Sequence, residues 1–155
     1  MQREVVKLDK VDRSLLKILQ QDSRVPLQVI AKRLGIPKST VHYRISRLER
    51  EKIIEGYYAK LNPAKLGYDY LAVVLVRAKY GPRYHQKVGL RLSKIPGVWA
   101  VYYVLGDLDF IVLIRALDRD DYIKKLERLS NMSDIERTST QVVARILKED
   151  PRMET

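Results

Sequence analysis

One stretch of the sequence constrains the fold of this chain more than any other: residues 27–50, LQVIAKRLGIPKSTVHYRISRLER. Apolar residues recur at helical spacing on both sides of Gly35, and glycine tolerates the left-handed backbone conformation with which helices often end. After this glycine, Val41, Ile45 and Leu48 form a single apolar stripe. The pattern predicts two helices that are joined by a tight turn and pack against each other.

The opposite side of the second helix is basic and rich in hydroxyl groups. At about 100° per residue, it carries Ser39, Tyr43, Ser46, Arg47 and Arg50, with His42 and Arg44 on the flanks. A helix that follows a tight turn and has such a surface suits the major groove of double-stranded DNA. The candidate DNA contacts are Lys38, Ser39, Thr40, His42, Tyr43, Arg44, Arg47 and Arg50. A plain solvated helix face is the alternative, and the pattern does not separate residues that read bases from those that contact phosphates.

The charge of the chain favours a polyanionic partner. Its 30 Lys+Arg against 19 Asp+Glu give a formal net charge of +11, so DNA or an anionic membrane surface is the natural partner to consider. Residues 1–60 hold 14 of these cations against 7 anions, whereas residues 61–155 hold 16 against 12. We therefore expect the N-terminal part to be the one that binds DNA.

Composition excludes several classes of site and location. The chain has no cysteine, which rules out disulfides, zinc fingers, iron–sulfur clusters and a thiol nucleophile. Its two histidines, His42 and His85, are far apart, and we expect no metal site and no cofactor. No apolar run approaches the ~18 residues that span a bilayer, and the first residues, MQREVVKLDK, lack the apolar core of a signal peptide. A cytoplasmic protein without a membrane partner is expected.

Three further segments complete the N-terminal part. Residues 8–22 predict a supporting helix with Asp9 as its N-cap, and residues 53–61 have the composition of a short strand or wing. Asn62-Pro63 and Gly67 mark a linker. The expected division is a helix-turn-helix domain over residues 1–60, a linker strand over 61–69 and a second domain over 70–155.

The period of the apolar pattern changes near residue 70. Strands are predicted at 70–80, 98–105, 110–117 and 134–148, and helices at 83–95 and 118–131. The order β-α-β-β-α-β is typical of a ferredoxin-like sheet with both helices on one face. The first three strands are apolar at nearly every position, so we expect a second subunit to cover the other face. The fold class is therefore α+β, with a winged helix-turn-helix domain before a ferredoxin-like domain.

A short loop between two of these strands is the candidate site for a small molecule. It has the composition of an ordinary hairpin turn, and it reads Gly106, Asp107, Leu108 and Asp109. Two carboxylates beside exposed backbone amides also suit a free amino acid, because Asp accepts from an ammonium group and amides donate to a carboxylate. The hydroxyls of Thr138 and Thr140 in the last strand are candidates to join this pocket, with simple strand polarity as the alternative.

These segments together resemble one known family. The marks are LDKVDRSLLKILQQDSRV at the start, IAKRLGIPKSTVHYRISRLEREKII in the helix-turn-helix, IIEGYYAKLNPAKLGY across the linker and PGVWAVYYVLGDLDF in the second half. In this order and spacing they resemble the prokaryotic Lrp/AsnC family of leucine-responsive and feast/famine regulators over almost the whole chain. Pro26 and Pro37 depart from the family, which often has serine at these places, because proline suits a first helical turn but cannot cap it.

The resemblance implies a transcription regulator and not an enzyme. Its ferredoxin-like domain would be of the RAM type and would form homodimers that assemble to octamers or other higher oligomers. An amino-acid effector would bind between dimers at the loop of residues 106–109. Two alternatives stay open: an enzyme of the haem-pathway decarboxylase type, which resembles the same two-domain architecture, and a stand-alone amino-acid sensor. The sequence specifies neither the operator, nor the amino acid sensed, nor whether transcription is activated or repressed.

Overall fold

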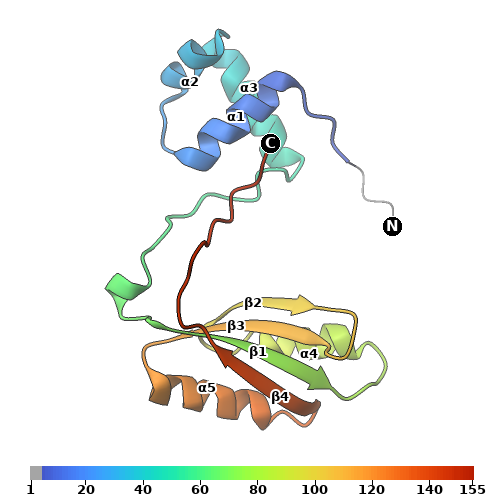
Figure 1. Ribbon diagram of the computed structural model, residues 1–155. Helices are drawn as coiled ribbons and strands as arrows, with labels where there is room; N and C mark the ends of the chain where they lie inside the picture. Colours follow the sequence, from blue (N-terminus) through green and yellow to red (C-terminus); the bar gives the residue numbers. More distant parts are fainter. Residues whose placement is uncertain (1–4) are drawn as a thin grey trace. The chain divides into compact units, whose positions relative to one another are not determined.

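The computed structural model describes residues 5–155 and divides the chain into two compact units, which Figure 1 shows with their helices and strands labelled. One unit contains the chain up to Lys60 together with Glu149–Thr155, and the other contains Leu61–Lys148. The division differs from the sequence-based one at residues 149–155, which group with the first unit. Residues 1–4 of the expected first domain lie outside the described part of the chain.

The first unit is built from three helices: α1 (Lys10–Gln21), α2 (Leu27–Leu34) and α3 (Lys38–Arg50). Their apolar sides meet in one core, at the centre of which Leu15, Ile30, Val41 and Leu48 have no exposed surface. These residues recur at the helical spacing that the sequence displays. The predicted helix-turn-helix is therefore present, with α1 as its support.

The ends of these helices follow the signals in the sequence. Asp9 caps α1 by accepting from the amide of Asp12 at 2.8 Å, and Asp12 returns the bond by accepting from the amide of Asp9 at 3.2 Å. Gly35 ends α2 with φ of 65°, and open space surrounds it, so its backbone conformation is what favours glycine there. Pro26 and Pro37 precede α2 and α3 without a side-chain cap, as expected of proline.

The short strand or wing predicted over residues 53–61 does not form. The amides of Ile53 and Ile54 both donate to the carbonyl of Leu48, at 2.9 and 3.1 Å, and so close the end of α3 after Lys52 adopts φ of 57°. Both isoleucines then pack against the three-helix core. The expected linker strand over 61–69 is also wrong, because that segment contains a single 3-10 turn at Ala64–Leu66. Neither segment has a partner strand within the described residues, and an isolated strand is not stable.

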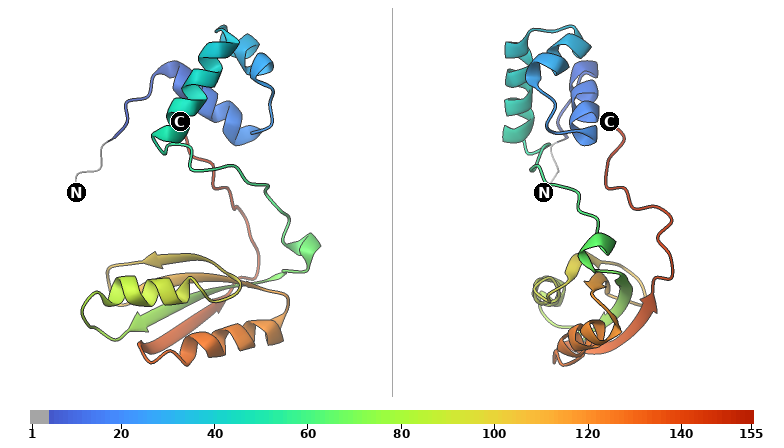
Figure 2. Two further views of the ribbon diagram at one scale, coloured as in Figure 1. Left: turned by 180° about the vertical axis from the view of Figure 1, so that it is seen from behind. Right: turned by 90° about the vertical axis from the view of Figure 1, so that its left-hand side faces the viewer.

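The second unit is a four-stranded antiparallel sheet with two helices, in the predicted order. Its elements are β1 (Tyr70–Ala78), α4 (Tyr84–Leu92), β2 (Val98–Tyr103), β3 (Phe110–Ala116), α5 (Arg119–Ser130) and β4 (Ile135–Val142). The strands lie in the order β2-β3-β1-β4, and Figure 2 shows α4 and α5 on the same face of the sheet. The last strand is shorter than the predicted 134–148, since its pairing with β1 ends at Ala72. This arrangement confirms the predicted α+β fold class with a ferredoxin-like domain.

The face of the sheet that the helices cover holds the core of this unit. Val74, Val76, Val112 and Ile114 point into it and have no exposed surface, and Phe110 is 1% exposed. Successive residues of a strand alternate between faces, so the neighbours of these core residues lie on the other side of the sheet. The register therefore determines which side chains the helices leave uncovered.

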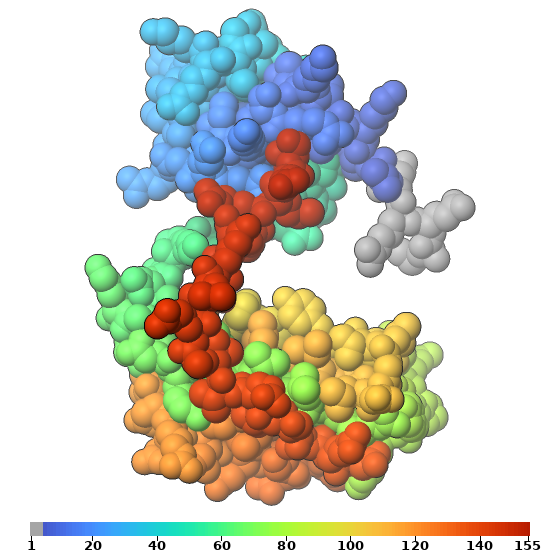
Figure 3. Space-filling model, viewed as in Figure 1, coloured from blue at the N-terminus to red at the C-terminus, as the bar shows by residue number. Residues whose placement is uncertain are grey.

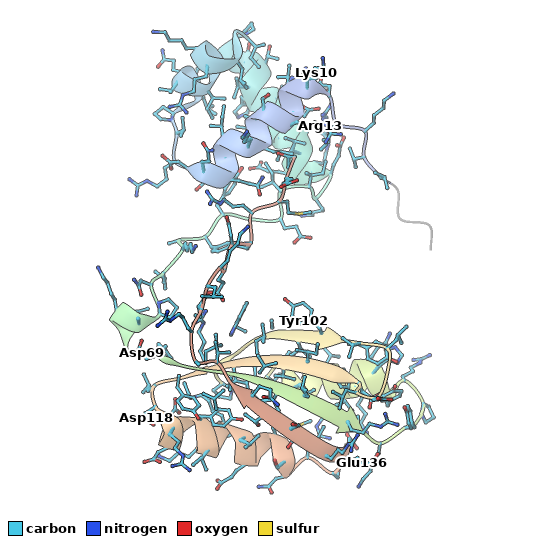
Figure 4. The ribbon with its side chains drawn as sticks, in the orientation of Figure 1. Lys10, Arg13, Asp69, Tyr102, Asp118 and Glu136 are labelled. Atoms are coloured by element: carbon cyan, nitrogen blue, oxygen red, sulfur yellow. The ribbon has the colours of Figure 1, made fainter. Side chains whose placement is uncertain are left out.

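The other face of the sheet is largely apolar. The cross-strand pairs Val73↔Leu113 and Leu75↔Ile111 lie at its middle, and on the edge strand β2 they are flanked by Trp99, Ala100 and Tyr102. Trp99 is 48% exposed and Tyr102 is 54% exposed, and Figure 4 shows Tyr102 projecting from β2 away from α5. We call this set of side chains the open sheet face. Neither helix of the second unit covers it, and the expectation that another subunit does so stays a prediction.

Candidate DNA-binding surface and effector loop

The exposed side of α3 is narrower than a helical wheel predicts. Val41 and Leu48 are buried, as expected, and the fully exposed residues of the helix are Lys38, Ser39, His42, Tyr43 and Arg50. Tyr43 is 61% exposed, although the side chain of tyrosine is usually about half-buried. We call these five residues the α3 stripe. Thr40 and Ser46 lie at its border and are partly covered.

Arg44 and Arg47 are not on this stripe, although both were predicted as DNA contacts. Nη1 of Arg44 lies 2.7 Å from Asp9 Oδ2 and 2.7 Å from Asp12 Oδ1, and Nη2 of Arg47 lies 2.5 Å from Asp12 Oδ2. The Asp12 side chain is only 1% exposed, so the two guanidinium groups neutralise a buried carboxylate. A helical wheel places Cα directions only, and these long side chains turn back to α1 to reach their partner.

The same ion pairs set the electrostatics of this end of the domain. The Asp12 amide, and after it the Arg44 guanidinium, lower the pKa of Asp9 below its usual value. Asp9 and Asp12 together raise the pKa of Arg44, which is charged at any physiological pH in either case. Nε of Arg47 is buried and makes no hydrogen bond, with Glu51 Oε2 3.8 Å away. The cluster therefore holds α3 on α1 through charge as well as through the apolar core.

Two exposed cations on α2 extend the basic surface beyond the predicted residues. Lys32 and Arg33 lie in the last turn of α2, and with Gln28 and Val29 they line a shallow pocket on the outside of the helix. Val29 is 39% exposed there. The sequence contains a feature that could have predicted this surface. Lys32 and Arg33 directly precede Leu34 and Gly35, and they lie on the polar side of a helix whose apolar side faces the core. The first helix of a helix-turn-helix crosses the DNA backbone, so cations at this place suit phosphates.

In the second unit, Asp109 is engaged by the fold, although it was predicted to bind an effector. Its carboxylate is 3% exposed, with Oδ2 accepting from the amide of Ala78 at 2.9 Å and Oδ1 accepting from the Tyr84 hydroxyl at 3.0 Å. The Tyr84 hydroxyl also lies 3.1 Å from that of Tyr103. The hydrogen bond with Tyr103, burial and then Asp109 raise the pKa of Tyr84 well above its usual value. Asp109 therefore fastens the loop to β1 and α4.

Asp107 is the free carboxylate of the loop. It is exposed, and its side chain has no partner within the described residues. Its main-chain oxygen accepts from the guanidinium of Arg77, which also lies over the ring of Tyr80 at 5.4 Å. Gly106 has φ of 145°, so the turn uses a conformation that favours glycine. The loop thus has a fixed backbone and one carboxylate that faces solvent.

The two threonines predicted to join this pocket lie on the far side of β1. Thr138 pairs with Val76 and Thr140 pairs with Val74, so both face the helices. The hydroxyl of Thr140 lies 2.7 Å from that of Tyr122 in α5. Within one copy of the chain, the structure does not bring these hydroxyls to the loop.

Other kinds of site find little support. Among the residues that the structure describes, no group of three or more His, Cys, Asp or Glu side chains could hold a metal ion. No helix over the same residues is long and apolar enough to cross a bilayer. The two candidate sites are therefore the basic surface of the helices and the loop with a free carboxylate.

Two models of known families match the chain. The model for winged helix-turn-helix DNA-binding matches residues 8–55, and the model for the Lrp/AsnC ligand binding domain matches residues 71–153. The chain belongs to the Lrp/AsnC family. The HTH-type transcriptional regulator FL11 of Pyrococcus furiosus is 36% identical over 142 residues, which cover 92% of this chain and 93% of that protein. FL11 of Pyrococcus horikoshii is 35% identical and covers 93% of this chain and 94% of its own length.

Solved Lrp/AsnC structures have the same fold. A feast or famine regulatory protein of M. tuberculosis complexed with L-methionine matches with a TM-score of 0.87 at 27% identity, covering 96% of this chain and all of that one. An AsnC family regulator of Agrobacterium tumefaciens matches with a TM-score of 0.88 at 24% identity over 94% of this chain and 96% of that chain, which shows the fold alone. The predicted family is confirmed, and this Lrp/AsnC protein is a DNA-binding transcriptional regulator and not an enzyme.

The pairing of Arg47 gives a prediction that separates structure from DNA contact. Arg47→Ala leaves the buried Asp12 carboxylate with one cation fewer, so we expect the free energy of unfolding to fall by about 1–2 kcal/mol, the scale of hydrogen bonds to charged groups. The matched control is Arg50→Ala on the α3 stripe, which should change stability by less than about 0.5 kcal/mol. Urea denaturation followed by circular dichroism measures both. Equal stability of the two variants would show that the ion pair does not support the helix.

Proposed function

We propose that the α3 stripe and the cations of α2 contact DNA, that the loop of residues 106–109 binds a free amino acid, and that the open sheet face joins two copies of the chain. The observation that carries this proposal is the α3 stripe. It is an exposed basic and polar side of a helix, and the ion pairs of Arg44 and Arg47 fix its orientation on α1.

The contacts with DNA fall into two groups. Lys38 and Arg50 at the two ends of α3, with Lys32 and Arg33 on α2, supply phosphate contacts. Ser39, Thr40, His42 and Tyr43 are placed in the first turns of α3, the part that reaches base edges in this motif. Arg44 and Arg47 position α3, and the N–H groups that Asp9 and Asp12 leave unused can still reach a phosphate, since each guanidinium carries five donors.

Arg50→Ala should weaken DNA binding without affecting the fold. Each copy of the proposed dimer loses one phosphate or base contact, and each loss costs about 1 kcal/mol or more. Two lost phosphate contacts also reduce the salt slope of binding by about two. Lys124→Ala is the control, because it removes the same charge from an exposed position on α5, outside the DNA-binding unit. Fluorescence anisotropy titrations of a DNA fragment at fixed salt compare the two variants. Equal affinities for the two variants would remove Arg50 from the interface.

The effector is proposed to be a free amino acid. The M. tuberculosis relative was crystallised with L-methionine, and Asp107 together with the backbone amides of the loop offers partners for an α-ammonium and an α-carboxylate. Asp109 holds the loop in shape, as its bonds to Ala78 and Tyr84 indicate. Thr138 and Thr140 could take part only if another copy of the chain brings a second loop to them.

Asp107→Ala should abolish the binding of L-methionine or weaken it at least tenfold, since a charge-assisted bond to the ammonium group is lost. Asp120→Ala is the matched control, because Asp120 is an exposed aspartate on α5. Isothermal titration calorimetry with L-methionine measures both variants and the wild-type protein. Undiminished binding by Asp107→Ala would place the effector elsewhere.

The open sheet face is proposed to pair with the same face of a second copy, and the dimers to assemble further to an octamer or another higher oligomer. Apolar side chains lie at its middle and polar ones, such as Ser139 and Gln141, at its β4 edge, which is the pattern of an interface with a polar rim. Pairing through one self-complementary surface gives a two-fold dimer. Such a dimer can present two α3 helices to successive major grooves, ~34 Å apart.

A charge at the centre of this face should separate the copies. Leu75→Glu places a carboxylate beside Ile111 and Val73, where burying it unpaired is costly, so we expect monomers where the wild-type protein forms dimers or larger assemblies. Leu90→Glu is the control, because Leu90 is 65% exposed on α4. Sedimentation velocity gives the mass of each. A Leu75→Glu variant that keeps the wild-type mass would contradict this interface.

A further inference from the structure

The segment Glu149–Thr155 groups with the DNA-binding unit, although it follows the last strand of the other unit. Figure 3 shows this segment, in red, against the blue surface of α1. The Gln20 side chain holds Met153 by its main chain: the Met153 amide donates to Oε1 at 2.7 Å, and Nε2 donates to the Met153 carbonyl at 2.9 Å. A strand offers its neighbour the same pair of bonds in an antiparallel ladder. Gln20 therefore binds the main chain of Met153, and the Met153 side chain stays 76% exposed.

A second contact lies two turns away on the same side of α1. The hydroxyl of Thr155 donates to the carbonyl of Arg13 at 3.3 Å, and seven residues separate Arg13 from Gln20, which aligns them on one side of a helix. Arg13 is labelled in Figure 4 beside this end of the chain. We call this side the α1 docking face. The hydrogen bonds of Met153 and Thr155 are made to α1 and not to the α3 stripe.

The charges of the two partners are complementary. The segment carries Glu149, Asp150 and Glu154 against a single Arg152, whereas residues 1–60 hold 14 Lys+Arg against 7 Asp+Glu. Arg152 binds the Asp150 carboxylate through Nε and Nη2, both at 2.8 Å, and lowers the pKa of Asp150. This ion pair closes a local turn and keeps Asp150 ionised. An acidic segment is thus held on the basic domain by attraction as well as by Gln20.

The residue at which the chain leaves the DNA-binding unit lies next to the residue at which it returns. The chain leaves after Lys60 and returns at Glu149, and Nζ of Lys60 donates to the carbonyl of Glu149 at 3.4 Å. A domain attached by one flexible linker can rotate about the bonds of that linker. Two linkers that start side by side and are fastened at Lys60 and Gln20 restrict that rotation.

We propose that the α1 docking face binds residues 149–155 of the same chain, and that the docked segment is a second tether which couples the motion of the DNA-binding unit to that of the ligand-binding unit. The part of this inference that concerns regulation rests on the proposed function, because it makes the segment a route by which an amino acid changes DNA binding. Gln20 is then a positioning residue. It contacts neither DNA nor effector and acts through the tether.

Amide hydrogen exchange on the full chain tests the docking. The Met153 amide should exchange at least about tenfold more slowly than in an unstructured chain, as its hydrogen bond requires. Gln20→Ala should remove this protection, and Gln21→Ala should keep it, because Gln21 is the exposed neighbour on α1. A Met153 amide that exchanges freely in the wild-type protein, or that stays protected in Gln20→Ala, would overturn the docking.

Nitrogen-15 relaxation of the same proteins tests the tether. Amides of α1, α2 and α3 should tumble faster in Gln20→Ala than in the wild-type protein and in Gln21→Ala, because the DNA-binding unit gains independent rotation. Equal tumbling in all three proteins would overturn the tether.

The effect of L-methionine on DNA affinity tests the regulatory part. If L-methionine alters the DNA affinity of the wild-type protein, Gln20→Ala should reduce that change. The same variant should still bind L-methionine as tightly as the wild-type protein, as measured by calorimetry. A failure of the proposed function appears separately, as a wild-type protein that binds neither DNA nor L-methionine while Met153 is still protected.

Discussion

The buried carboxylate of Asp12 is the interaction on which the DNA-binding surface depends. It accepts from both Arg44 and Arg47 and also closes the cap of α1. An unpaired carboxylate at this depth would be costly, so the position of α3 relative to α1 is restricted to the few arrangements in which both guanidinium groups reach it. The apolar core determines which side of α3 is buried, through Val41 and Leu48. The ion pairs add a directional constraint to this packing, and the resulting orientation leaves Lys38, His42 and Arg50 exposed.

In the second unit, one carboxylate likewise stabilises the fold while another is left exposed. Asp109 is buried and uses its carboxylate to fasten the loop between β2 and β3, while Asp107, two residues away, keeps its carboxylate in solvent. Arg77 adds a bond to the Asp107 carbonyl from the adjacent strand. A loop that is rigid before a ligand arrives loses less conformational freedom on binding, which favours affinity. In the proposed dimer, the open sheet face of the same unit supplies the apolar surface that joins two copies of the chain.

The sequence predicted the architecture well and the roles of single side chains less well. Apolar periodicity, Gly35 and Asp9 located the three helices, and the alternation after residue 70 gave the β-α-β-β-α-β order. The residues whose partners the sequence did not reveal are charged. Arg47 lies on the outer side of a helical wheel, yet its side chain turns back to α1, and Asp109 resembles a ligand-binding aspartate until its partners Ala78 and Tyr84 are known. The residues 53–61 are β-prone, but a strand needs a partner, and that depends on tertiary structure.

DNA binding by this chain is proposed to depend on the cations that α2 and α3 display in paired copies. The most direct measurement is the affinity of the wild-type protein for its DNA as a function of salt concentration. Lys32, Arg33, Lys38 and Arg50 in each of two copies would neutralise about eight phosphates, which predicts a slope of log K against log salt of about −7, because each phosphate contributes about −0.9. A slope no steeper than about −2 would exclude this interface, since so few phosphate contacts cannot involve the α2 and α3 cations of both copies.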